Sequence, residues 1–269
     1  ADLVAKRLVV IYPTLKLGQQ LKIVQSIIDT TAESELYYDS IDTLQSLSLS
    51  PEIFVSILAQ NKINSEDGSS DPTKRRRRRS STTNKAVLQR EEVSHIAEIH
   101  LRKLTIILET LDKSNAKGTE PLLATLFNLL SDLEILDQDG GLPVLYAQET
   151  LSSCMLNTIE TLKEDDTVKL KSIRADILVS AIRSSPSPQV QNKLLLVIGA
   201  LATLSPETVL HSVMPIFTFM GAHTIRQDDE FSTHVVEKTI STVVPALLES
   251  GSSNKIDEIE FLLMSFVTA

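Results

Sequence analysis

The chain has 269 residues, of which 42% are hydrophobic, but only 4% are aromatic, none is Trp and only 8 are Gly. This composition favours helices and speaks against an α/β catalytic domain or a β-sandwich, because Gly costs about 1 kcal/mol at an interior helix site and unbranched side chains lose little freedom there. The net charge is −9, and six cationic residues stand together at 74–79, so the rest of the chain carries −15. Such an acidic body repels nucleic acid, whereas the basic run attracts it.

A single cysteine, Cys154, excludes an intramolecular disulfide and is typical of a reducing compartment. No apolar stretch approaches the roughly 20 uninterrupted residues that a membrane-spanning helix needs, and the first residues lack a signal-peptide cleavage site. The sequence has no initiator Met and stops within an apolar helical pattern. We therefore expect a piece of a longer chain that has no membrane partner.

Apolar residues at steps of three and four positions predict helices along most of the chain. In chain order the predicted helices are 2–12, 20–29, 34–47, 51–62, 86–112, 121–136, 144–162, 173–183, 189–204, 207–220 and 229–249. The connections between them are short and polar, with no strand pattern. This arrangement favours an all-α bundle or solenoid.

Two Ser-Pro-Glu tripeptides, at 50–52 and 205–207, predict helix starts. Ser can accept a hydrogen bond from a free backbone N–H, Pro is tolerated at the first helical position, and an acid is favoured in the first turn. Ser-Pro is also the motif of proline-directed phosphorylation, but only the cap accounts for all three residues.

A recurring pattern, apolar-x-Pro-x-apolar, distinguishes a bundle from a solenoid. It occurs at 11–15, 213–217 and 243–247. Pro among apolar helical residues bends a helix, and bent first helices paired with straighter second helices are typical of HEAT repeats of about 40 residues. The alternative is that Pro lies near a helix end three times. We predict a HEAT-like α-solenoid, a right-handed superhelical stack of antiparallel helix pairs, with the apolar helix 189–204 between neighbouring repeats.

One segment, 64–84, contains no aliphatic or aromatic residue, and eight of its 21 residues are Ser or Thr. It cannot bury enough apolar surface to offset the entropy of ordering, so we predict a disordered inserted loop. The chain then divides into N-terminal HEAT-like helices at 1–63, the loop at 64–84, and HEAT-like repeats at 85–269.

Enzyme motifs are absent from the sequence: it has no phosphate-binding loop, dinucleotide fingerprint or nucleophile elbow. His95 and His100 are five positions apart, not the four of a helical zinc pair, and His100 is interpreted as a packing residue. Cys154 is interpreted as a small apolar filler without a basic partner. The other histidines are His211, His223 and His234, and the adjacent pairs Asp165-Asp166 and Asp228-Asp229 are interpreted as helix-end charges instead of a metal site or an acid/base pair. We predict no catalytic activity, cofactor, metal or small-molecule substrate.

The basic run is the strongest functional signal, and it consists of Lys74, Arg75, Arg76, Arg77, Arg78 and Arg79. A cationic run in a flexible loop can serve a nuclear-import receptor or neutralise nucleic-acid phosphates. Aromatic residues for base stacking do not interleave with it. A solvated linker remains the alternative, and Ser80 has the context of a basophilic kinase site.

The last third of the chain carries a more specific pattern. VMPIFTFMG at 213–221, RQDDEFS at 226–232 and VVEKTISTVVP at 235–245 together resemble one family. It is the very large HEAT-repeat protein family of the small-subunit processome, known in fungi as the U-three small nucleolar RNA-associated protein ten family. The close match spans 213–245, with a looser likeness back to about 168, whereas 1–160 resembles the family in pattern only.

The resemblance implies a central slice of a long solenoid that scaffolds pre-rRNA processing and 40S biogenesis in the nucleus and nucleolus. It implies β-propeller partners from the transcription-associated group of processome proteins, and places the 5′ external transcribed spacer of pre-rRNA nearby, with the basic run as its candidate contact. It implies no catalytic residues. The family-motif positions expected to be structural are Pro215, Gly221, Arg226, Asp228 and Asp229, with Pro215 bending a helix and Gly221 ending it.

Two other HEAT classes stay open at this point. Nuclear transport receptors are acidic solenoids that bind basic signals, although a cationic loop would compete with their cargo. A regulatory HEAT scaffold for a phosphatase is the third class, and no feature of the sequence is dedicated to it.

Overall fold

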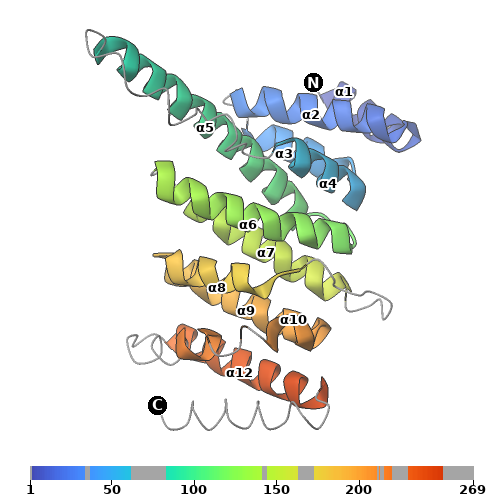
Figure 1. The fold of residues 1–269 in the computed structure, drawn as a ribbon. Coiled ribbons are helices and arrows are strands. Elements are labelled where there is room, and N and C mark those ends of the chain that lie inside the picture. The colour runs from blue at the N-terminus through green and yellow to red at the C-terminus, as the bar shows by residue number, and fades with distance from the viewer. Residues whose placement is uncertain are drawn as a thin grey trace.

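A computed structural model describes residues 2–33, 37–61, 83–140, 144–162, 173–210, 212, 215–219 and 230–250. All regular structure in these ranges is helical, and the helices are stacked one above another from the N-terminal end to α12 (Figure 1). The elements are α1 (Asp2–Ile11), the 3₁₀ turn η1 (Tyr12–Thr14), α2 (Leu17–Glu33), α3 (Tyr37–Ser46), α4 (Pro51–Gln60), α5 (Thr83–Asp112), α6 (Glu120–Gly140), α7 (Leu145–Leu162), α8 (Ala175–Ser184), α9 (Pro188–Leu204), α10 (Pro206–Leu210) and α12 (Glu230–Ser250). The all-α prediction is confirmed.

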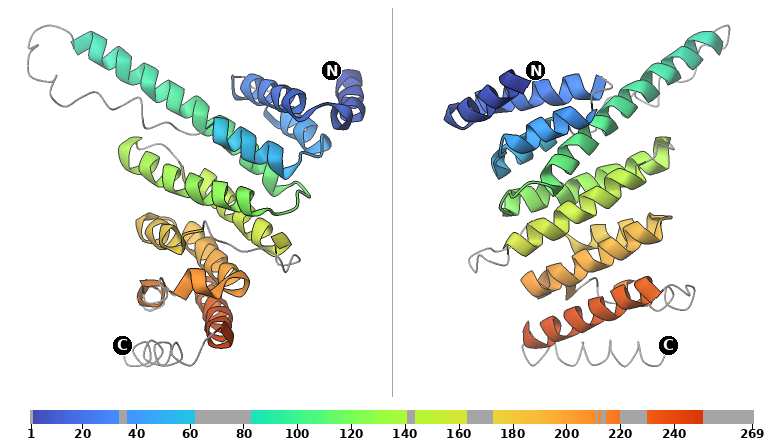
Figure 2. Two further views of the ribbon diagram at one scale, coloured as in Figure 1. Left: turned by 45° about the vertical axis from the view of Figure 1, so that its right-hand side comes forward. Right: turned by 180° about the vertical axis from the view of Figure 1, so that it is seen from behind.

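The helices form two layers. In one layer α5 packs on α7, α7 on α9 and α9 on α12, while in the other α4 packs on α6 and α6 on α8. The pairs α6–α7 and α8–α9 join the two layers, and Figure 2 shows both layers from two further sides. This arrangement of helix pairs stacked in sequence is the predicted α-solenoid.

The core runs along the stack between the layers. Leu104, Leu126, Leu151 and Leu194, from α5, α6, α7 and α9 respectively, are all at most 1% exposed. Helix α9 contacts α7, α8, α10 and α12. Its apolar sequence is therefore explained by neighbours on several sides, as predicted for 189–204.

Helix α5 is longer than its neighbours, with 30 residues against 21 in α6. At 1.5 Å per residue it is about 45 Å long, and its N-terminal part extends beyond α2 and α6 (Figure 1). It begins at Thr83, so residues 83 and 84, the last two of the predicted loop 64–84, belong to the helix and not to a loop. The remainder of that predicted loop lies outside the described residues.

The three prolines of the recurring pattern do not share one position, so the expectation of a bent first helix is wrong at Pro13 and stays a prediction at Pro215. Pro13 lies in η1, directly after α1, where its fixed φ and missing N–H suit a short turn. Pro215 is the first described residue of a helical stretch, 215–219. Only Pro245 lies inside a helix, α12. The predicted helix 207–220 is also divided, into α10 and 215–219.

Helix starts follow the Ser-Pro pattern with one correction. Pro51 opens α4, but the Ser50 side chain makes no cap to the backbone. It hydrogen-bonds to the Glu52 carboxylate instead, which lowers the pKa of Glu52. At α9 the backbone N–H of Val190 does donate to Ser187 Oγ, at 3.4 Å, so the Ser187-Pro188 pair provides the side-chain cap that Ser50-Pro51 lacks.

Candidate interaction surface

Most of the predicted site residues lie outside the described residues: the basic run Lys74–Arg79, and Gly221, Arg226, Asp228 and Asp229. Pro215 is described. The backbone N–H of Ile216 next to it donates to the Ser212 carbonyl at 3.1 Å, and Pro215 lines a surface groove of about 530 Å³ with Glu134 and Arg183. The roles of these positions stay predictions.

Polar contacts join successive helices of the layer that contains α5, α7, α9 and α12. Between α5 and α7, Asn157 Nδ2 donates to Asp112 Oδ1 at 3.2 Å, and between α9 and α12, Asn192 Nδ2 donates to Ser232 Oγ at 2.8 Å. The partners are 45 and 40 residues apart in sequence. These separations match one HEAT-like pair of helices, so each contact connects equivalent helices of neighbouring repeats.

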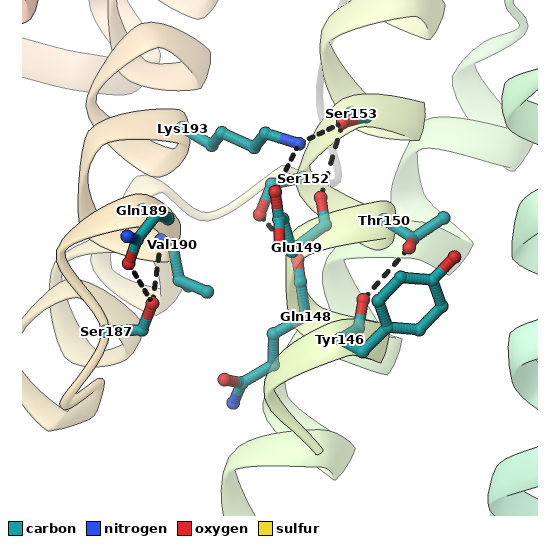
Figure 3. A network of polar contacts seen from close by, with 10 residues as sticks. All are labelled: Tyr146, Gln148, Glu149, Thr150, Ser152, Ser153, Ser187, Gln189, Val190 and Lys193. Atoms are coloured by element: carbon teal, nitrogen blue, oxygen red, sulfur yellow. Dashed lines mark hydrogen bonds and ion pairs between the residues drawn. The ribbon is translucent and has the colours of Figure 1, made fainter. Parts of the chain in front are cut away.

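Lys193 makes the most connected of these contacts (Figure 3). Its Nζ lies 3.1 Å from Glu149 Oε1 and 2.9 Å from Ser153 Oγ, so one ammonium on α9 holds two successive turns of α7. Its positive charge also reaches Asp112 on α5, where it lowers the pKa. Burial acts more strongly in the opposite direction, and the net pKa of Asp112 is raised. Lys193 therefore links three helices of the layer electrostatically.

Tyr146, at the start of α7, contacts α5. Its Oη donates to Glu109 Oε1 at 2.7 Å, although the residue is 56% exposed. The hydrogen bond to Glu109, together with burial and the charge of that carboxylate, raises the pKa of Tyr146 to about 12. The phenol thus stays a donor throughout the neutral range.

The described part of the chain offers no group of His, Cys, Asp and Glu side chains arranged to hold a metal ion. His95 and His234 are exposed and His100 is half-buried, while His211 and His223 lie outside the described residues, as does the pair Asp165-Asp166. Cys154 is 1% exposed and donates to the Leu108 carbonyl at 3.3 Å. Burial raises its pKa, so the interpretation of Cys154 as a packing residue fits. Among the described helices none is long and apolar enough to cross a membrane.

Two surface depressions lie beside α9 and α12, and neither is predicted by the sequence. One, of about 270 Å³, lies over Gly199 of α9 between Glu160 of α7 and Lys238 of α12. The other, of about 540 Å³, lies where the end of α9 meets α12 at Pro245. Apolar periodicity alone locates neither, because each is formed by residues distant in sequence.

No protein-family model matches the chain, and no solved structure matches it significantly. A protein of Kluyveromyces lactis is 70% identical over 271 residues, one of Saccharomyces cerevisiae is 65% identical over 269, and both cover 100% of this chain. Over its whole length the chain is similar to part of U3 small nucleolar RNA-associated protein 10.

The chain spans about 15% of the length of these relatives. A protein of the same name from Candida albicans is 49% identical over 93% of this chain, and the matched region makes up 14% of that protein. The resemblance seen at 213–245 is confirmed. It also extends through 1–160, where the sequence pattern alone was unspecific.

Proposed function

We propose that this chain is a non-catalytic scaffold segment of the small-subunit processome that acts in early pre-rRNA processing and 40S ribosome biogenesis. The observation that carries the proposal is the similarity of the whole of this chain to a part of U3 small nucleolar RNA-associated protein 10, at 65–70% identity in three fungi. Nucleolar localisation follows from the same proposal, since a protein associated with a small nucleolar RNA works in that compartment.

The fold supports a scaffold role. A stack of helix pairs exposes a long surface relative to its mass, and each repeat contacts only its neighbours, so many partners can be placed along it. The proposed partners are processome proteins, among them the β-propeller subunits of the transcription-associated group.

Sedimentation of the whole protein tests this function. We expect the full-length protein to co-sediment with pre-ribosomal particles and to leave that fraction after ribonuclease treatment. A protein that instead binds the small transport GTPase and stays outside the particles would support the transport-receptor class and contradict the proposal.

We further propose that Lys74–Arg79 contacts pre-rRNA phosphates in addition to serving nuclear import. Its six charges must supply most of the affinity, because the rest of the chain carries −15. Six contacts at about 0.7 each give a slope of log affinity against log salt of about −4 on single strands. Sequence preference is expected to be weak, since Arg and Lys without stacking aromatics contact phosphate.

The test is a salt titration of RNA binding by this chain beside a variant with Arg75–Arg79 changed to Ser. The variant should bind more weakly and with a shallower slope. Equal affinity and equal slope in the two proteins would eliminate the RNA contact and leave import or a passive linker.

A further inference from the structure

We propose that the pocket between the end of α9 and the proline of α12 binds an arginine side chain presented by a protein partner. The pocket has a volume of about 540 Å³ and is lined by Thr203 and Pro206 on one side and by Ser241, Thr242, Pro245 and Glu249 on the other. This inference deepens the scaffold role by naming what a partner presents, and it rests on that role only for the partner's identity.

The hydroxyl groups lining the pocket have already used their protons. Thr203 Oγ1 donates to the Ala200 carbonyl at 2.8 Å, while Ser241 Oγ and Thr242 Oγ1 both donate to the Lys238 carbonyl, at 2.9 and 2.7 Å. A hydroxyl has one proton and two lone pairs. All three groups therefore present only acceptor lone pairs to the pocket.

Pro245 has no N–H to donate, and it leaves the Ser241 carbonyl as a fourth acceptor. In an α-helix the carbonyl of residue 241 would accept from the N–H of residue 245, but Pro has none. The Ser241 carbonyl thus loses its regular helical donor at the wall of the pocket. Pro206, on the opposite wall at the first position of α10, also has no N–H to offer.

The electrostatics of the pocket favour a cation. Glu249 contributes a carboxylate, and α9 ends at Leu204, so the negative end of its dipole lies beside Thr203. The nearby cation on α12, Lys238, lines the neighbouring groove over Gly199 and is not part of this pocket's lining.

Among protein side chains, Arg fits this chemistry best. Its guanidinium offers five donors and no acceptor, remains charged, and is planar and weakly hydrated, so it can lie against a Pro ring while its N–H groups reach the surrounding oxygens. Lys offers three donors on a compact, strongly hydrated charge, and we expect it to bind more weakly.

The probe is the peptide acetyl-Gly-Arg-Gly-amide, titrated into the isotopically labelled chain and followed by the amide signals of Thr203, Ser241, Thr242 and Glu249. We expect saturable shifts at these amides. The same peptide with citrulline, which keeps the shape but lacks the charge, should bind at least about tenfold more weakly, as expected when a charged hydrogen bond is lost. A Lys peptide should lie between the two.

Three variants make the assignment specific. Glu249→Gln should weaken Arg-peptide binding about tenfold. Pro245→Ala should weaken it roughly fivefold, because the new N–H occupies the Ser241 carbonyl, and it favours the helix, so loss of folding is no explanation. Glu237→Gln removes an exposed acid of the same helix outside the pocket and should leave binding within about twofold.

Absence of shifts at these four amides would overturn the proposal, and so would equal weakening by Glu249→Gln and Glu237→Gln, which would indicate general charge attraction. Neither result bears on co-sedimentation with pre-ribosomal particles, so failure of this site and failure of the scaffold function are distinguishable.

Discussion

The backbone N–H of Gly118 donates a hydrogen bond to Thr161 Oγ1 at 2.8 Å, which ties the connection between α5 and α6 to the last turn of α7. The approach is possible only because residue 118 has no side chain. A Cβ there would lie 2.2 Å from the Thr158 carbonyl oxygen and 2.5 Å from Thr161 Oγ1. The requirement for Gly at this position is one of space, imposed by backbone atoms that cannot easily move.

Gly118→Ala should therefore destabilise the protein by about 2–3 kcal/mol, because the connection must shift away from α7 and the hydrogen bond to Thr161 is weakened. Urea unfolding followed by circular dichroism measures the change. A variant as stable as the parent would show that the connection moves freely.

Gly199→Ala is the matched control for Gly118→Ala, because here the added Cβ has room. A Cβ at residue 199 would lie 3.8 Å from its nearest neighbours on α12, an ordinary contact distance, and the residue lies in the interior of α9. Ala is favoured over Gly in a helix by about 0.5–1 kcal/mol, so this substitution should stabilise the protein by a similar amount in the same assay. Destabilisation would contradict the described packing of α9 against α12.

Lys193→Met should cost about 1 kcal/mol, since it keeps the side-chain stem but removes the ammonium that contacts Glu149 and Ser153. It should also raise the pKa of Asp112 further, because the charge of Lys193 lowers it in the parent. Carboxyl signals in a pH titration report this shift. Lys238→Met, at an exposed position, is the control and should change neither quantity appreciably. We expect Lys193→Met to lower the free energy of unfolding by less when Glu149→Gln is already present. Equal losses with and without Glu149→Gln would show that the two side chains are not coupled.

Tyr146→Phe tests the contact between α7 and α5 through pH. The folded pKa of Tyr146 is raised from 10.0 to about 12, so the stabilising contribution of the protonated phenol is fully present below about pH 10 and is lost as the pH rises through about 12. At neutral pH the substitution should cost about 0.5 kcal/mol, reduced by exposure to solvent. The difference in stability between parent and variant should shrink above pH 10. A difference that is constant up to pH 12 would refute the hydrogen bond to Glu109.

Replacement of residues 64–82 by a short Gly-Ser linker should leave the melting temperature unchanged, because that segment contains no aliphatic or aromatic residue. A fall of several degrees would correspond to about 1 kcal/mol or more of lost contacts and would show that the segment packs on the helices.

Sequence periodicity predicted the helices and their stacking well because burial imposes the apolar spacing. Helix α9 is the clearest case, since four neighbouring helices explain its apolar sequence. The sequence could not distinguish the position of Pro13 from that of Pro245, because a proline among apolar residues suits both a turn after a helix and a bend within one.

The arginine pocket could not be predicted from the sequence for another reason. Its acceptor character depends on where three hydroxyl protons point, and that is decided by the helices to which Thr203, Ser241 and Thr242 belong.

The hydrogen bonds between neighbouring repeats span 36 to 46 residues of sequence, from the Asn61–Gln25 hydrogen bond to the Ser180–Glu134 hydrogen bond. Neighbouring repeats are thus connected like links arranged in series. A tension applied to the two ends of the chain would pass through every such joint in turn, and the weakest joint would set the force at which the stack elongates. Small tilts at the individual joints would add up over the stack. The solenoid could therefore stay bound to an assembly that changes in size by bending, without any of its helices unfolding.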